Sequence, residues 1–211
     1  MKTWQRYEAY LLTGEWHIHT SHTDGKNSIA EYCEAALKNS ISLLAFTEHV
    51  AKKLTYSFDN LLEEVNKAKS KYDDLIILSG CEVKVLPDGS LNVLDEVIER
   101  VDYPIFAFHA FPEDPDLFLN CLKEALADSR LNAWAHPFSF LAKNNTHLDL
   151  KVVEEILRMM KKYDVLLECN RKHDGLPSEW SELANKIGVS IVNGNDIHSI
   201  NDIRTPSFNT Q

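Results

Sequence analysis

Short runs of Leu, Ile, Val, Phe and Ala recur along this chain of 211 residues, and six of them are closed by histidine, aspartate or glutamate. Apolar runs of this length are typical of strands buried in a parallel sheet. Seven strands are predicted, at Glu15–His19, Leu43–Thr47, Leu75–Val85, Pro104–His109, Asn132–Ala135, Val165–Cys169 and Val189–Asn193. Metal-ligand residues at the carboxyl ends of such strands would meet at one rim of the fold.

Amphipathic stretches lie between the predicted strands. Helices are expected near Ser28–Asn39, Phe58–Lys71, Val93–Val101, Asp114–Ala127, Lys151–Tyr163 and Ser178–Ile187. Alternating strands and helices indicate βα units, so the chain is assigned to the α/β class with a barrel-like arrangement.

Local signals fix some of the element ends. Ser28 with Glu31 predicts a capping box, Ser178 is expected to start the last helix, and Gly188 suits a left-handed C-cap. The segment Pro87–Gly89 predicts a tight turn within a small hairpin, and Asn144–Asp149 a surface loop.

No repeat, low-complexity tract or linker divides the sequence, which predicts a single domain over residues 1–211. No apolar stretch of about 18 residues is present, so no membrane span is expected. The first 16 residues carry charges throughout and lack a signal-peptide core, which makes the cytoplasm the expected location. The four cysteines are widely spaced and form no CxxC pair, so buried free thiols are expected.

The net charge of −10 disfavours a surface for long nucleic acids, which usually carries a basic patch. It does not exclude a small phosphorylated ligand, because bound divalent ions would make one pocket locally positive.

Nine residues stand out as candidate metal ligands. His17 and His19 share one face of a strand, because side chains alternate with period two. Glu82 ends a strongly apolar run, where a carboxylate is rare unless it is paired or metal-bound. The full set is His17, His19, Asp24, His49, Glu82, His109, His136, Asp196 and His198. Imidazole-rich sets with carboxylates suit zinc, manganese or iron better than calcium or magnesium.

The motifs that hold these residues are HIHTSHTDG, FTEH, GCEV, DYPIFAFH, AHP, LLECN and NDIHS. Together they resemble the PHP (polymerase and histidinol phosphatase) family of metal-dependent phosphoesterases, over residues 15 to about 202. The resemblance implies a distorted seven-stranded (β/α)7 TIM-like barrel, in agreement with the strand count, and a site for three divalent metal ions (Zn, Mn or Fe).

The resemblance also implies how the ligands divide. One ion would be held by His17, His19, Glu82 and Asp196. A second would be held by Glu82, His109 and His136, with Glu82 bridging. The third would be held by Asp24, His49 and His198. A metal-bound water held near Glu82, Asp196 and His198 is the expected nucleophile.

Other polar residues receive supporting roles. Arg171 and His173 are predicted to contact the substrate, since guanidinium suits phosphate oxygens. Glu48 and Asn170 are expected to orient the ligands. His22 is interpreted as solvent-facing or ligand-orienting and His147 as a surface residue. Trp134 and Cys169 are interpreted as packing residues.

The predicted function is hydrolysis of a small phosphomonoester by a compact acidic enzyme. Cleavage of phosphodiesters at nucleic-acid ends is the close alternative. An amidohydrolase is disfavoured because no strand ends in the bridging lysine typical of that group. A non-catalytic module that binds metal is a further alternative, although no ligand position is lost.

Overall fold

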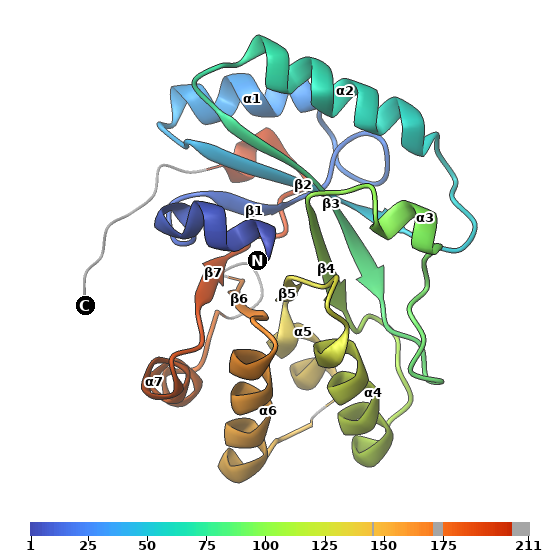
Figure 1. The fold of residues 1–211 in the computed structure, drawn as a ribbon, viewed down its shortest axis with the longest axis vertical. Coiled ribbons are helices and arrows are strands. Elements are labelled where there is room, and N and C mark those ends of the chain that lie inside the picture. Colours follow the sequence, from blue (N-terminus) through green and yellow to red (C-terminus); the bar gives the residue numbers. More distant parts are fainter. Residues whose placement is uncertain (145, 171–174, 204–211) are drawn as a thin grey trace.

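The computed structural model describes residues 1–144, 146–170 and 175–203, and their centre is a sheet of seven parallel strands. The strands follow one another around the sheet in chain order (Figure 1). They are β1 (Glu15–Ile18), β2 (Leu43–Val50), β3 (Ile76–Lys84), β4 (Tyr103–Ala107), β5 (Ala133–Trp134), β6 (Leu166–Cys169) and β7 (Ile191–Asn193).

The sheet closes between β1 and the segment that follows β7. The amide of His19 donates to the carbonyl of Ile197 at 2.8 Å, and the amide of Ile197 donates to the carbonyl of His17 at 2.9 Å. Closure by parallel pairing makes this a seven-stranded (β/α) barrel, which confirms the predicted fold class.

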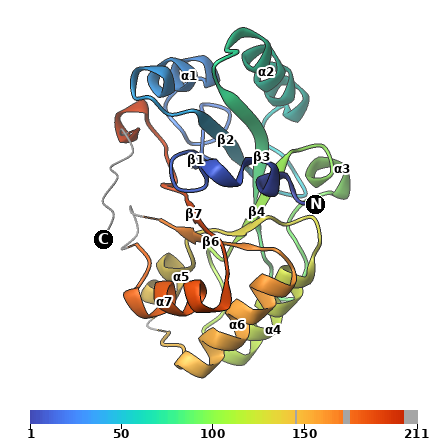
Figure 2. The same cartoon turned by 60° about the vertical axis from the view of Figure 1, so that its left-hand side comes forward.

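Helices cover the outside of the barrel (Figures 1 and 2). The α-helices are α1 (Ile29–Lys38), α2 (Phe58–Lys71), α3 (Asp95–Ile98), α4 (Pro115–Ala127), α5 (Pro137–Lys143), α6 (Leu150–Lys162) and α7 (Ser178–Ile187). Two 3-10 helices, η1 (Thr3–Tyr10) and η2 (Ile200–Asp202), precede and follow them. Within the described residues, no helix is both long enough and apolar enough to cross a bilayer.

Two apolar clusters fill the molecule. The larger lies between the strands and the helices and includes Phe46, Phe106 and Trp134, each at most 1% exposed. The smaller lies around Trp16 and Tyr103, whose rings meet edge to face, and it includes Trp4 of η1. The Trp4 indole donates to the carbonyl of Asp164, which precedes β6, so η1 covers the amino-terminal end of the strands.

The predicted element ends are mostly confirmed. Ser28 and Glu31 form the capping box, and Gly188 ends α7 in the left-handed region at φ 83°. The turn at Gly89 joins a short antiparallel bridge between Val85 and Leu91, as predicted.

Helix α7 begins at Ser178, as predicted, and its N-cap is Pro177. One predicted helix is shorter than expected, and one helix was not predicted. Helix α3 has four residues against the nine predicted. Helix α5, directly after β5, was not predicted, because its seven residues are too few to establish a 3.6-residue pattern.

Candidate metal centre

The nine predicted ligands lie at one rim of the barrel, on or just beyond the carboxyl ends of the strands. His17 lies within β1 and His19 follows it, and both side chains are fully buried. Their Nε2 atoms are 3.1 Å apart, which agrees with the predicted common face.

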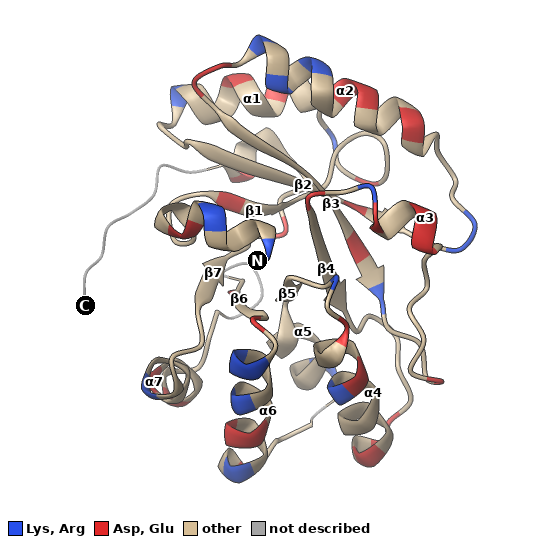
Figure 3. Cartoon of the chain, in the orientation of Figure 1, with Lys and Arg blue, Asp and Glu red and all other residues tan. Residues whose placement is uncertain are grey.

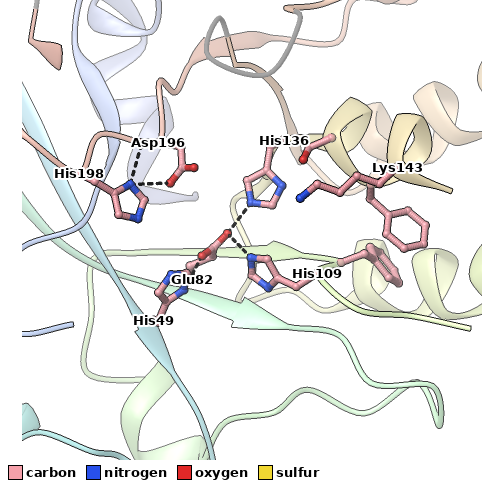
Figure 4. A pocket seen from close by; sticks show the side chains of 10 residues that line it. His49, Glu82, His109, His136, Lys143, Asp196 and His198 are labelled. Carbon is pink, nitrogen blue, oxygen red and sulfur yellow. Dashed lines mark hydrogen bonds and ion pairs between the residues drawn. The ribbon is translucent and has the colours of Figure 1, made fainter. Parts of the chain in front are cut away.

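Glu82 occupies the middle of the group and is 2% exposed. One of its oxygens, Oε1, lies 2.7 Å from Nε2 of His136 and 3.3 Å from Nε2 of His109. The other, Oε2, lies 2.7 Å from Nδ1 of His49, which is the residue paired with Glu82 in the neighbouring strand. Figure 4 shows the three imidazoles around this carboxylate. Strand register therefore brings together residues that are far apart in sequence.

The loop after β7 supplies Asp196 and His198. Asp196 has a left-handed backbone at φ 50°, and its Oδ1 lies 3.2 Å from Nε2 of His19 and 3.7 Å from Nε2 of His17. A strained backbone of this kind is often found where a side chain has to be aimed at a site.

Asp24 approaches from the loop after β1. Its Oδ2 lies 3.4 Å from Nε2 of His49 and 3.3 Å from Nε2 of His198. Its side chain is half exposed, so this part of the group is open to solvent.

The described residues contain three sets whose donor atoms all lie within 4.8 Å of one another. They are His19, Asp24, His49 and His198; His17, His19 and Glu82; and His49, Glu82 and His109. Each pair of sets shares one residue. His19 belongs to the first and second sets, Glu82 to the second and third, and His49 to the first and third. Three overlapping sets make a compact triangle of potential ion positions. The first set contains all three residues predicted to share an ion, the second contains three of the four predicted for another, and the third has His49 in place of the predicted His136.

The donor chemistry fits divalent transition metals. Imidazole nitrogens dominate, each of the three sets contains one carboxylate, and donors of both kinds suit zinc, manganese or iron. The buried Nδ1 of His19 has no hydrogen-bond partner among the described residues. Since buried polar atoms are usually satisfied, this nitrogen is available for coordination.

Opposite charges shift the pKa values in this group. Burial opposes ionisation of Glu82, but the imidazoles of His109, His136 and His49 hold its pKa well below the usual value. Burial likewise opposes ionisation of Asp196, but the neighbouring His19 and His17 lower its pKa. Both carboxylates are therefore ionised at neutral pH and able to bind cations.

The pKa values of His17 and His19 shift in opposite directions. Burial lowers the pKa of His19 to about 4, so this imidazole is neutral at pH 7, as a metal ligand must be. Burial also acts on His17, but there the carboxylates of Glu168 and Glu82 outweigh it and raise the pKa to about 10.

Glu168 of β6 is a site residue that the sequence analysis missed. Its Oε2 lies 2.8 Å from Nδ1 of His17, and its Oε1 accepts hydrogen bonds from the backbone amide of His136 and from Asn170 Nδ2. A carboxylate inside the run VLLEC is the signal that could have identified it, because such a group is costly to bury alone.

Glu48, predicted to orient the ligands, is fully buried and holds the loop that carries Asp24. It accepts hydrogen bonds from the amide of Thr20, at 2.8 Å, and from the hydroxyl of Thr23. His22 is half-buried, and its Nε2 lies 3.2 Å from Oε2 of Glu64. Arg171 and His173, the predicted substrate contacts, lie outside the described residues.

A cavity of about 240 Å³ opens onto the group. Six predicted ligands line it: His49, Glu82, His109, His136, Asp196 and His198. Four residues that were not assigned to the site complete the lining: Phe108, Ser139, Phe140 and Lys143. Figure 4 shows Lys143 extending from α5 toward His136.

Comparison with known proteins identifies relatives of this chain. The chain is 28% identical over 202 residues to the DNA polymerase/3'-5' exonuclease PolX of Bacillus subtilis, covering 92% of this chain but 35% of that protein. It is 23% identical to a "Probable phosphatase" of Aliivibrio fischeri, covering 89% of this chain and 78% of the relative.

Among solved structures, the fold is similar to that of histidinol phosphate phosphatase from Lactococcus lactis, which was crystallised with zinc, L-histidinol and phosphate. The TM-score is 0.70 at 16% identity, covering 90% of this chain and 87% of the other. The model of the PHP domain matches residues 15–172, and the chain therefore belongs to the PHP family.

Proposed function

We propose that this protein is a metal-dependent phosphoesterase that hydrolyses a small phosphomonoester. The observation that supports this most directly is the triangle of overlapping donor sets at the floor of an open cavity. The carboxyl-terminal rim of a (β/α) barrel is also where enzymes of this architecture carry out their chemistry.

Three divalent ions would be held as the resemblance implies. His17, His19, Glu82 and Asp196 would hold one, Glu82, His109 and His136 the second, and Asp24, His49 and His198 the third. Glu82 Oε1 contacts Nε2 of His136 and of His109, and Oε2 lies 3.7 Å from Nε2 of His19, so the carboxylate faces residues proposed for both the first and the second ion, which supports its bridging role.

Bound ions would lower the pKa of water and neutralise phosphate oxygens. The protein's own groups then orient the reactants. Asp196 lines the cavity and is ionised, so its carboxylate is placed to accept a hydrogen bond from the attacking water and fix its direction. Nδ1 of His198 lies 3.5 Å from Oδ1 of Asp196, so its imidazole is placed to help orient the same water, together with the carboxylate of Glu82.

A monoester is favoured by the size of the cavity and by the surface charge. A volume of about 240 Å³ suits a phosphoryl group and part of a small leaving group. Figure 3 shows acidic and basic residues interspersed along α2, α4 and α6, whereas a nucleic-acid surface is usually uniformly basic. The Lactococcus lactis neighbour was crystallised with phosphate and zinc, which supports the same class of substrate.

A second candidate is cleavage of phosphodiesters at nucleic-acid ends. The similarity to the PolX exonuclease over 92% of this chain favours it. The same ion positions would serve either reaction, so the leaving group and the cavity wall decide between them.

The test is hydrolysis of p-nitrophenyl phosphate and of bis(p-nitrophenyl) phosphate by protein loaded with zinc or with manganese. Turnover of the monoester, reduced about 100-fold or more in Asp196→Asn, is expected. Asp202→Asn is the matched control, because Asp202 is an exposed aspartate of η2. Preference for the diester would favour the second candidate, and turnover of neither by metal-loaded protein would refute both.

A further inference from the structure

Helix α5 contributes two polar side chains and one aromatic ring to the lining of the cavity. Ser139 and Lys143 both line it, and they are four residues apart, so they lie on the same side of the helix. Phe140 is 5% exposed and packs against Phe118 and Phe108, which fixes α5 on the barrel. The position of the Lys143 backbone is therefore set by apolar packing.

Lys143 is the sole lysine or arginine among the described residues that line the cavity. Its side chain is exposed, and it forms no ion pair with any residue in the described ranges. Figure 4 shows its side chain extending from α5 toward His136. A cation in the lining of the same cavity as six of the proposed ligands is placed to contact an anion bound there.

The charge of the substrate determines how the ammonium group of Lys143 can interact with it. A phosphomonoester is a dianion above a pH of about 6, with three non-bridging oxygens, whereas a diester is a monoanion with two. Once bound ions contact some of these oxygens, a monoester keeps a further charged oxygen facing the cavity. A lysine donates charge-assisted hydrogen bonds to such an oxygen.

We propose that Lys143 is a specificity-determining residue that binds the outward non-bridging oxygen of a phosphomonoester and so favours dianionic monoesters over monoanionic diesters. Ser139, on the same face one turn earlier, adds a hydroxyl donor. The inference rests on the proposed function, because it concerns the substrate of that same centre.

The kinetic test compares Lys143→Met with the wild type on p-nitrophenyl phosphate and bis(p-nitrophenyl) phosphate at pH 8. For the monoester, kcat/KM is expected to fall by about 10- to 100-fold, mainly through KM, whereas for the diester it changes by less than about threefold. Lys143→Arg keeps the charge and is expected to retain most of the activity.

Lys38→Met is the matched control. Lys38 is also an exposed lysine in the last turn of a helix, where its charge interacts with the helix dipole as that of Lys143 does. An unchanged monoester rate in Lys38→Met is expected. A loss equal to that of Lys143→Met would reduce the effect of Lys143 to helix stability and overturn the proposal.

A binding test separates this inference from the proposed function. Calorimetry of zinc-loaded protein is expected to give inorganic phosphate a dissociation constant about 10- to 100-fold weaker in Lys143→Met, with that of dimethyl phosphate unchanged. Equal effects on both anions, or no effect on phosphate, would refute the role of Lys143 even if the wild type hydrolyses monoesters. Conversely, selective phosphate binding without any turnover would support Lys143 and reject catalysis.

Discussion

Glu168 and His17 lie 151 residues apart in the chain, yet the carboxylate Oε2 of Glu168 is 2.8 Å from Nδ1 of His17. Both side chains are almost completely buried. The contact fixes the orientation of the imidazole and leaves its Nε2 directed toward His19 and Glu82. A carboxylate behind a histidine in this way also makes the imidazole a stronger metal ligand.

We therefore expect Glu168→Gln to weaken metal binding by about 10- to 100-fold. The amide keeps the size of the side chain but removes the negative charge that Nδ1 faces. Competition with a chromogenic chelator measures the affinity. Glu182→Gln, on the exposed surface of α7, is the control. Equal affinities in Glu168→Gln and the wild type would show that the buried contact serves only packing.

Glu82, unlike Glu168, is itself a predicted ligand, and it contacts three other predicted ligands. Its carboxylate is proposed to bridge two ions, whereas Asp24 is proposed to bind one. We expect Glu82→Gln to lose two equivalents of metal after dialysis and Asp24→Asn to lose one. Elemental analysis of the two variants and the wild type gives the answer. Loss of the same number of ions from both variants would contradict the bridging assignment.

The sequence predicted the barrel and the common rim of the candidate ligands for one physical reason. Each predicted ligand stands at or near the end of an apolar run, as at Glu82 and His109, and parallel strands bring their carboxyl ends to one rim. The arrangement of these residues therefore follows from strand order and register.

What the sequence did not predict depends on contacts across the barrel. The pairing of Glu168 with His17 requires the barrel to close, so that only β7 and the segment after it separate β6 from β1, which no local pattern records. Lys143 was missed because α5 is short and begins with Pro137, so its segment was not recognised as a helix. Glu168 lies behind His17 and Lys143 lines the cavity, and tertiary packing determines where both side chains lie.

Asp102 lies away from the metal centre, at the start of β4, and offers a test of stability. Its Oδ2 accepts hydrogen bonds from Lys69 Nζ at 2.7 Å, from the amide of Ser79 at 3.0 Å and from the Ser79 hydroxyl at 2.9 Å. Partial burial opposes ionisation, but Lys69 and Ser79 outweigh it and lower the pKa of Asp102. A lowered pKa in the folded state means that this stabilisation is present above the unfolded pKa of about 3.9 and is lost as the pH falls through the folded pKa.

Asp102→Asn is therefore expected to lower the free energy of unfolding by about 1 kcal/mol at pH 7, and by progressively less below about pH 4. Urea unfolding at several pH values measures this difference. Asp59→Asn is the control, since Asp59 pairs with Arg100 at 2.6 Å but is largely exposed, where ion pairs contribute little. A difference for Asp102→Asn that does not change between pH 7 and pH 3 would contradict the assignment of the effect to its charge.

Gly25 follows Asp24, and its position allows no side chain. A Cβ at Gly25 would lie 2.0 Å from the carbonyl oxygen of His19, well inside contact distance, so the loop must move to accommodate one. That loop is held by the hydrogen bond from the Gly25 amide to the Thr20 carbonyl and by the one from the Lys26 amide to the His198 carbonyl. Movement of this loop displaces Asp24 from His49 and His198, which are proposed to hold the third ion with it. Gly25→Ala is therefore expected to lose the third ion and to keep the other two.

Elemental analysis combined with thermal unfolding checks this expectation. Gly188→Ala is the matched control, because Gly188 has φ 83° at the end of α7 and an alanine there is strained but far from the cavity. It is expected to cost about 1 kcal/mol, or roughly 2–4 °C in Tm, with all ions retained. Full metal content in Gly25→Ala would show that the loop can shift without moving Asp24, whereas metal loss in both variants would assign the loss to general destabilisation. Loss of one ion from Gly25→Ala alone would place the third ion position beside the close approach of Gly25 to His19.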